Sequence, residues 1–201
     1  IVTASPTFPV TPMSYDTSYK GDLDVTLSIL DANAKTIKYS TFFGTENFDR
    51  ANDMEIDSKG NILVGGFEYG LIDSVSFPIT TDAYLAEGGP GFLAKFSPDL
   101  SSLLYCSKID GYLWTMGIKQ NDELLLVERN GPANNCPSGG FDSTKNGDLD
   151  VVIRKLSSDL SQINACTYFG GNRDDFAYSM ALDEFENIYL TGRTCSQDLP
   201  V

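Results

Sequence analysis

The chain has 201 residues, with 14 Lys and Arg against 28 Asp and Glu and no histidine. The net charge of −14 repels phosphate backbones, so the composition argues against nucleic-acid binding. No apolar run approaches the roughly 18 residues of a membrane-spanning helix, and the lack of histidine excludes Ser-His-Asp triads and imidazole zinc sites.

The first segment, IVTASPTFP, has neither a basic start nor a long apolar stretch, so we expect no signal peptide within this chain. Residue 1 reads as the middle of a strand, and the chain as part of a longer polypeptide. Alternating apolar residues predict a first hairpin, with strands at Asp24–Leu30 and Thr36–Phe43. A second hairpin follows, with strands at Ala51–Ile56 and Ile62–Gly66 around a turn that contains Gly60.

Both hairpins recur later in the chain. Residues 21–66 align without a gap onto residues 147–192, an offset of 126 (147 minus 21), and 17 of the 46 positions are identical. A degenerate copy lies between them, since residues 95–108 match residues 155–168 at an offset of 60 (155 minus 95). A dipeptide that ends in proline recurs once in each unit, at Phe8-Pro9, Phe77-Pro78, Cys136-Pro137 and Leu199-Pro200.

Four short antiparallel strands thus repeat about every 60–70 residues, which is typical of the blades of a β-propeller. We predict an all-β fold of about three such blades, with strands a to d in chain order, as part of a larger propeller. Helices should be scarce, because no stretch keeps apolar residues at i, i+3, i+4 and i+7. The predicted blades are 1–44 (strands b–d), 45–109, 110–170 and 171–201 (strands a and b).

The string DSKGNILVGG (Asp57–Gly66) resembles the SBBP (seven-bladed β-propeller) repeat, as does the strand YSTFFG at Tyr39–Gly44. The resemblance recurs three times and covers nearly the whole chain. It implies a scaffold or binding module of large secreted or surface-attached bacterial proteins, and it brings no shared catalytic motif. The middle copy departs from the pattern, because Pro90 stands where the other copies have Asp24 and Asp150.

The four cysteines show no metal-binding spacing. Cys106 and Cys166 occupy one repeat position, a full repeat apart, so we expect both to be buried small hydrophobes without a bridge. Cys136 and Cys195 fall in equivalent polar loops, and these two are the candidate disulfide.

The motif GDLD occurs twice and gives carboxylates at i and i+2, namely Asp22 with Asp24 and Asp148 with Asp150. Such a pair could supply oxygen ligands to calcium, the only cofactor that the sequence suggests. The alternative is that one Asp of each pair accepts backbone N–H bonds while the other faces solvent. The sequence favours the alternative, because no complete calcium loop with a bidentate Glu follows.

These features predict a non-enzymatic, extracellular or cell-surface module for adhesion to protein subunits or surface glycans, next to further blades or domains of the same polypeptide. Its contact surface would be the b–c and d–a loops, with Tyr112 and Trp114 as contact residues. The alternative is a carbohydrate-active propeller, a glycoside hydrolase or lyase that uses Asp/Glu pairs. An enzyme should gather its carboxylates at one end of the central channel, whereas a scaffold should scatter them.

Overall fold

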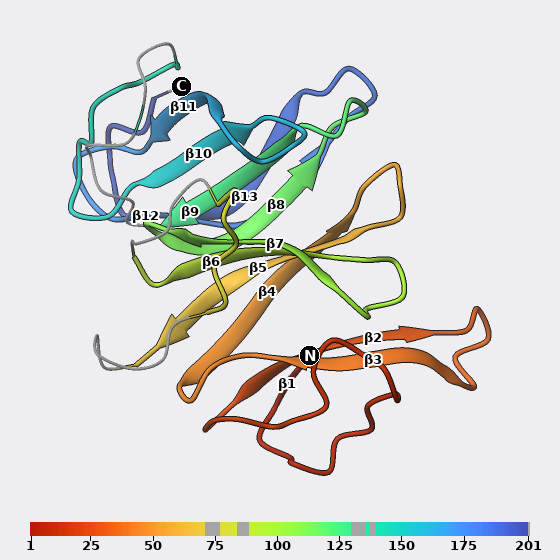
Figure 1. Ribbon diagram of the computed structural model, residues 1–201. Coiled ribbons are helices and arrows are strands. Elements are labelled where there is room, and N and C mark those ends of the chain that lie inside the picture. The colour runs from red at the N-terminus through yellow and green to blue at the C-terminus, as the bar shows by residue number, and fades with distance from the viewer. Residues whose placement is uncertain (71–76, 84–88, 130–135, 137–139, 201) are drawn as a thin grey trace.

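The computed structural model of the chain describes residues 1–70, 77–83, 89–129, 136 and 140–200. In these ranges the chain forms strands, turns and loops with no helix, and therefore no helix long and apolar enough to span a membrane. Figure 1 shows four antiparallel sheets that follow one another from the N-terminal end at the bottom to the C-terminal end at the top. The predicted all-β fold of propeller-like blades is therefore confirmed, and the sheets do not close into a ring.

The middle two sheets have four strands each, in chain order. The second sheet contains β4 (Phe48–Ile56), β5 (Ile62–Tyr69), β6 (Gly91–Phe96) and β7 (Leu103–Ile109). The third contains β8 (Tyr112–Ile118), β9 (Leu124–Arg129), β10 (Val151–Leu156) and β11 (Ile163–Phe169). These strands follow the order a, b, c and d of the predicted blades.

The first and last sheets are incomplete versions of the same unit. The first contains β1 (Val2–Thr3), β2 (Asp24–Leu30) and β3 (Ile37–Phe43), which correspond to strands b, c and d. The last contains β12 (Asp175–Leu182) and β13 (Ile188–Thr194), which correspond to strands a and b. Each of the four sheets falls within one predicted blade range. The a strands meet across the sheets, β4 against β8 and β8 against β12, and so form the inner edge of the array.

The turns repeat an uncommon backbone conformation, with one residue at positive φ in the left-handed region. In the a–b turns this residue is Gly60, Asp122 or Glu186, and in the c–d turns it is Ala34, Leu100 or Leu160. Leu100 and Leu160 tolerate this strained conformation because their side chains are buried in the core. Equivalent turns of different blades therefore share the same backbone conformation at the same position.

Apolar side chains fill the space between successive sheets. Val25 and Phe43 of the first sheet pack with Val64 and Phe92 of the second. Leu63 and Leu93 of the second sheet pack in a second cluster, with Leu113 and Leu126 of the third. Each such side chain contributes about 1.5–3 kcal/mol when fully buried, so these interfaces hold the inner strands in a fixed arrangement.

Candidate functional site

The two GDLD loops place their carboxylates in contrasting surroundings. Asp24 and Asp150 are buried, whereas Asp22 and Asp148 are exposed. The backbone N–H groups of residues 20 and 21 donate to Asp24 at 2.9 and 3.2 Å, and those of residues 146 and 147 donate to Asp150 at 2.7 and 3.3 Å. One Asp therefore fixes each loop and the other faces solvent. The part of the chain that the structure describes holds no group of three or more acidic, thiol or imidazole side chains suited to a metal, and calcium stays a prediction.

Each buried Asp instead lies near an Asp of the next inner strand. A methyl group placed on Gly44 would lie 2.6 Å from Asp49 Oδ2 and 3.3 Å from Asp24 Oδ1. The same construction on Gly170 meets Asp150 Oδ1 at 2.7 Å and Asp175 Oδ2 at 3.1 Å. The two glycines thus leave the room in which pairs of buried carboxylates meet between successive blades.

The two carboxylate pairs differ in their proton affinity. Burial raises the pKa of Asp49 to about 7, with a further rise from the neighbouring Glu68 and Asp24. Burial alone would also raise the pKa of Asp175, but hydrogen bonds, among them those from Thr194 and Gly171, hold that pKa below its usual value. The first pair is therefore the one that binds a proton near neutral pH.

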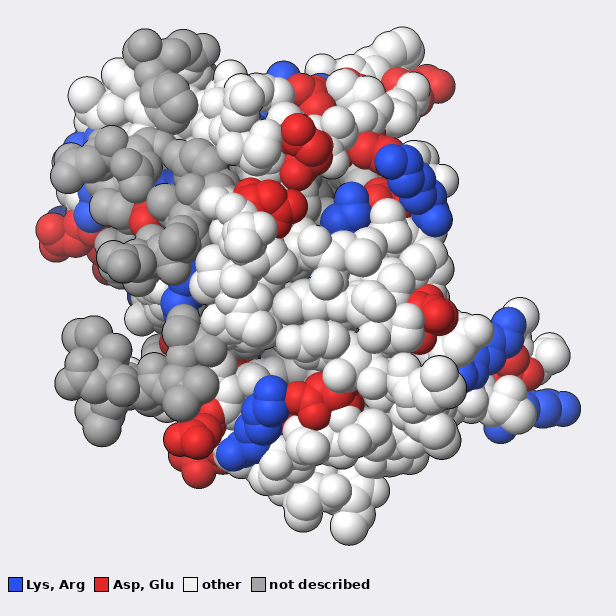
Figure 2. Space-filling model, viewed as in Figure 1, with Lys and Arg blue, Asp and Glu red and all other residues white. Residues whose placement is uncertain are grey.

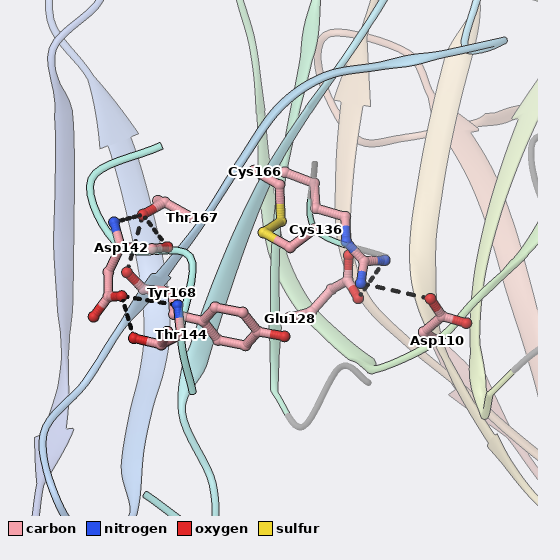
Figure 3. Close-up of a disulfide and its surroundings, with 9 residues drawn as sticks. Asp110, Glu128, Cys136, Asp142, Thr144, Cys166, Thr167 and Tyr168 are labelled. Atoms are coloured by element: carbon pink, nitrogen blue, oxygen red, sulfur yellow. Dashed lines mark hydrogen bonds and ion pairs between the residues drawn. A yellow bond between two sulfur atoms is a disulfide. The ribbon is translucent and has the colours of Figure 1, made fainter. Parts of the chain in front are cut away.

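The disulfide of the structure joins Cys136 to Cys166, with their Cα atoms 5.2 Å apart (Figure 3). The predicted bridge between Cys136 and Cys195 is therefore wrong, as is the prediction that Cys166 has no bridge. Cys195 is a free thiol directly after β13, and its Sγ lies 3.3 Å from Nη2 of Arg193. Cys106 is free and buried, as predicted, and burial raises the pKa of its thiol to about 12.

The bridge follows from the path of the b–c connection, which crosses strand d of its own blade. In the first blade, the Ser40 N–H donates to Thr11 Oγ1 at 3.0 Å, and in the second the Cys106 N–H donates to Thr80 Oγ1 at 3.1 Å. Cys136 lies on the same path in the third blade, where Cys166 takes the position of Ser40 and Cys106. It therefore meets Cys166 and not the thiol of the next blade.

A buried ion-pair cluster lies beside this disulfide (Figure 3). Arg154 is the cross-strand neighbour of Cys166, and it places Nη1 3.2 Å from Glu128 Oε2 and Nη2 3.6 Å from Asp110 Oδ2. Burial raises the pKa of Glu128 to about 7, although Arg154 acts in the opposite direction. Arg154 and Glu128 are buried, and the side chain of Asp110 is 7% exposed, so we assign the cluster a structural role.

The second blade fills the equivalent space with apolar atoms. Ala94 is the cross-strand neighbour of Cys106, as Arg154 is of Cys166. Phe77, which precedes Pro78 as Cys136 precedes Pro137, is the counterpart of Cys136 in the second blade. Its ring centroid lies 4.9 Å from that of Phe43 and 4.5 Å from that of Phe92. In the second blade the large Phe77 is thus combined with the small Ala94 on strand c. In the third blade the small Cys136 is combined with the long Arg154. The two blades conserve volume with different chemistry.

Tyr112 and Trp114, the predicted contact residues, lie on inner strand β8, and both are half-buried. A β-bulge between Leu113 and Thr115 changes the direction in which the side chain of Trp114 points. The other two a strands have bulges at the equivalent position. The indole Nε1 is buried and has no hydrogen-bond partner among the described residues.

Rings continue from these two residues across three blades. The ring centroid of Trp114 lies 6.1 Å from that of Tyr178 and 6.0 Å from that of Phe67. The centroid of Tyr112 lies 5.2 Å from that of Phe67 and 5.8 Å from that of Tyr69. Phe67 is buried, whereas Tyr69 is 55% exposed and Tyr178 is 50% exposed. We call the accessible rings, namely Tyr69, Tyr112, Trp114 and Tyr178, the aromatic surface.

Residues 166–200, which include β12 and β13, match the model of the SBBP family, a beta-propeller repeat. This segment is therefore similar to an SBBP repeat. No curated protein matches the sequence.

The aromatic surface differs from the predicted contact surface. Tyr112 and Trp114 do come together, but Tyr69 and Tyr178 join them from other blades and were missed. Alignment of the repeats could have identified Tyr178, because Trp114 and Tyr178 both occupy the bulged position of strand a. The predicted b–c contact loops lie in part outside the described residues, at 71–76, 84–88, 130–135 and 137–139.

Proposed function

We propose that this partial propeller is a non-enzymatic binding module of an extracellular protein, and that its aromatic surface contacts surface glycans or protein subunits. The observation that carries the proposal is the aromatic surface itself. Tyr and Trp rings provide a large contact area at low entropic cost, and half-exposed rings on rigid inner strands are suited to that role.

Two further features support an extracellular setting and a scaffold. The Cys136–Cys166 disulfide fits an oxidising compartment, because cytosolic reductants keep most thiols reduced. On the face in Figure 2, acidic and basic side chains are scattered among uncharged ones. That pattern is the one expected of a scaffold rather than of an enzyme with carboxylates gathered at one end of a channel.

The carbohydrate-active alternative would need the paired carboxylates. Asp49 has the raised pKa that a general acid requires, and Asp24 lies beside it. Both side chains are fully buried, however, and a substrate would have to reach them. We therefore place this alternative second. Release of reducing ends from a glycan, abolished by Asp49→Asn, would favour it.

Trp114 is the single tryptophan of the chain and lies within the proposed site, so its fluorescence reports on binding. We expect its emission to change saturably when soluble oligosaccharides of defined composition are added to the chain. Tyr178→Ala and Tyr69→Ala should each weaken binding. The matched control is Tyr39→Ala, at a similarly exposed tyrosine on β3, outside the aromatic surface. Equal binding by all three variants would contradict the proposed site.

A further inference from the structure

The last three blades each carry one arginine opposite one aromatic residue, at the same cross-strand position of strands a and b. The paired residues are Arg50 with Phe67, Tyr112 with Arg129, and Phe176 with Arg193. The arginine lies on strand a in the second blade and on strand b in the next two. Three repeats of this pairing make it a feature of the architecture rather than of one loop.

The pairs also meet between blades. The ring of Phe67 packs against that of Tyr112, with centroids 5.2 Å apart. The guanidinium carbon of Arg129 lies 4.5 Å from the ring centroid of Phe176, and that of Arg193 lies 5.6 Å from the same centroid. The six side chains thus form a continuous row, which we call the arginine–aromatic ladder. It lies directly beside the aromatic surface and shares Tyr112 with it.

Among the ion pairs of the described residues, none involves Arg50, Arg129 or Arg193. Arg50 and Arg193 are exposed, while Nε of the half-buried Arg129 has no hydrogen-bond partner in the described ranges. Acidic residues outnumber basic ones two to one in this chain, 28 against 14. Arg193 donates a hydrogen bond to Cys195 Sγ at 3.3 Å. Three guanidinium groups in one row without an ion pair among the described residues therefore indicate a site for an anion.

The chemistry of the row narrows the ligand class. A guanidinium stacked on a ring keeps its N–H groups free for bidentate contact with a carboxylate. The neighbouring rings of Tyr69 and Tyr178 are about half exposed and offer flat apolar faces. A chain of sugar units with carboxylates supplies partners for both, because its carboxylates suit the guanidinium groups and its ring faces suit the aromatic side chains.

We propose that the arginine–aromatic ladder binds an oligosaccharide of uronic acids, with its carboxylates on Arg50, Arg129 and Arg193 and its sugar rings against the aromatic surface. This proposal rests on the binding role proposed above and names its ligand class. An acidic peptide shares the charge but lacks the flat, hydroxyl-bearing rings.

The test is calorimetric titration of the full 201-residue chain with an oligogalacturonate, in low salt and with a chelator to exclude calcium bridging. The probes for comparison are the carboxyl-reduced form of the same oligosaccharide and a poly-glutamate peptide. We expect the oligogalacturonate to bind at least about tenfold more tightly than either, since hydrogen bonds to charged groups are the strong ones.

The variants separate the ladder from general attraction between charges. Arg193→Gln and Arg50→Gln should each weaken oligogalacturonate binding about tenfold. Arg50→Lys, which keeps the charge but loses the planar fork, should also weaken it. Arg173→Gln, at an exposed arginine outside the ladder, is the matched control and should leave binding unchanged. A melting curve for each variant establishes that it is folded.

Four outcomes would overturn the proposal. Equal binding of the carboxyl-reduced oligosaccharide would remove the uronate assignment and leave the aromatic binding site standing. Poly-glutamate binding as tight as that of the oligogalacturonate would point to an acidic peptide. Equal weakening by Arg173→Gln would indicate non-specific attraction. No binding of any probe, with the Trp114 emission unchanged, would remove both this proposal and a glycan-binding role for the surface.

Discussion

Cys136 is bonded to Cys166 across strand d of the third blade, so the b–c connection of that blade is fixed to its own outer strand. The bridge closes a loop with a sequence separation of 30. Closing such a loop restricts the unfolded chain, and we expect Cys136→Ser to lower the free energy of unfolding by about 2–4 kcal/mol. Urea unfolding measures this loss, and Cys195→Ser is the control that should change little. Non-reducing peptide mapping that linked Cys136 to Cys195 would contradict the assignment.

The raised pKa of Asp49 predicts a pH dependence of stability. Its folded-state pKa is about 7, against an ordinary value of 3.8, so between these limits the folded chain holds a proton that the unfolded chain has lost. Stability from this group is therefore full below pH 4 and is lost as pH rises through 7. The slope is at most about 1.4 kcal/mol per pH unit for one proton. Glu128, with a pKa raised to about 7 by burial, contributes with the same sign.

Urea unfolding at several values between pH 4.5 and pH 8 (roughly the window of these shifts) checks this dependence. Asp49→Asn should flatten the curve, since the amide does not titrate. Asp22→Asn, at an exposed Asp of the neighbouring loop, should leave the curve as it is. An unchanged slope in Asp49→Asn would assign the dependence to Glu128 alone.

The sequence predicted the strands well because their signal is local. Strand c of the first blade has the predicted limits Asp24–Leu30, and strand d, predicted at Thr36–Phe43, runs over Ile37–Phe43. Alternating apolar residues and polar turns lie within a few residues of each other, and the repeat supplies the same pattern several times. The fold class follows from these signals alone.

The site residues required the cross-strand register, which no local pattern contains. Asp22 and Asp24 are neighbours in sequence, yet one is exposed and the other is buried against Asp49. Arg129 meets Phe176 only because two blades pack against each other. Sequence equivalence suggested a bridge from Cys136 to Cys195, whereas the path of the loop decides the partner. Contacts between distant segments are therefore the part that sequence reasoning missed.

A second contact between blades lies in the a–b turns. Asp122 accepts hydrogen bonds from the N–H of Ser58 at 2.9 Å and from its hydroxyl at 2.5 Å. The pattern recurs one blade later, where Glu186 Oε1 accepts from the N–H of Gln120 at 3.2 Å. Asp122 also has a positive φ, which Asn tolerates better than Ala. We expect Asp122→Ala to lower the melting temperature by a few degrees and Asp122→Asn to lower it less. Equal losses would show that the contact with Ser58 contributes little.

The ion pair between Arg154 and Glu128 predicts strongly non-additive mutations. Arg154→Met keeps much of the volume of the side chain but leaves Glu128 buried without a counter-charge. Removing one partner of a buried pair costs about 3–5 kcal/mol, whereas replacing both partners with uncharged groups is often close to neutral. We therefore expect the double variant Glu128→Gln, Arg154→Met to recover most of the stability that Arg154→Met loses. A double-mutant cycle from urea unfolding measures the coupling.

The second blade gives this last prediction a natural reference, because Ala94 stands there where the third blade has Arg154, and Phe77 fills the space. The blade is therefore compatible with an uncharged core at this position. If the double variant lost as much stability as the sum of the two single variants, the charges would not be coupled. Arg154 would then stabilise the third blade through packing beside the disulfide rather than through its ion pair with Glu128.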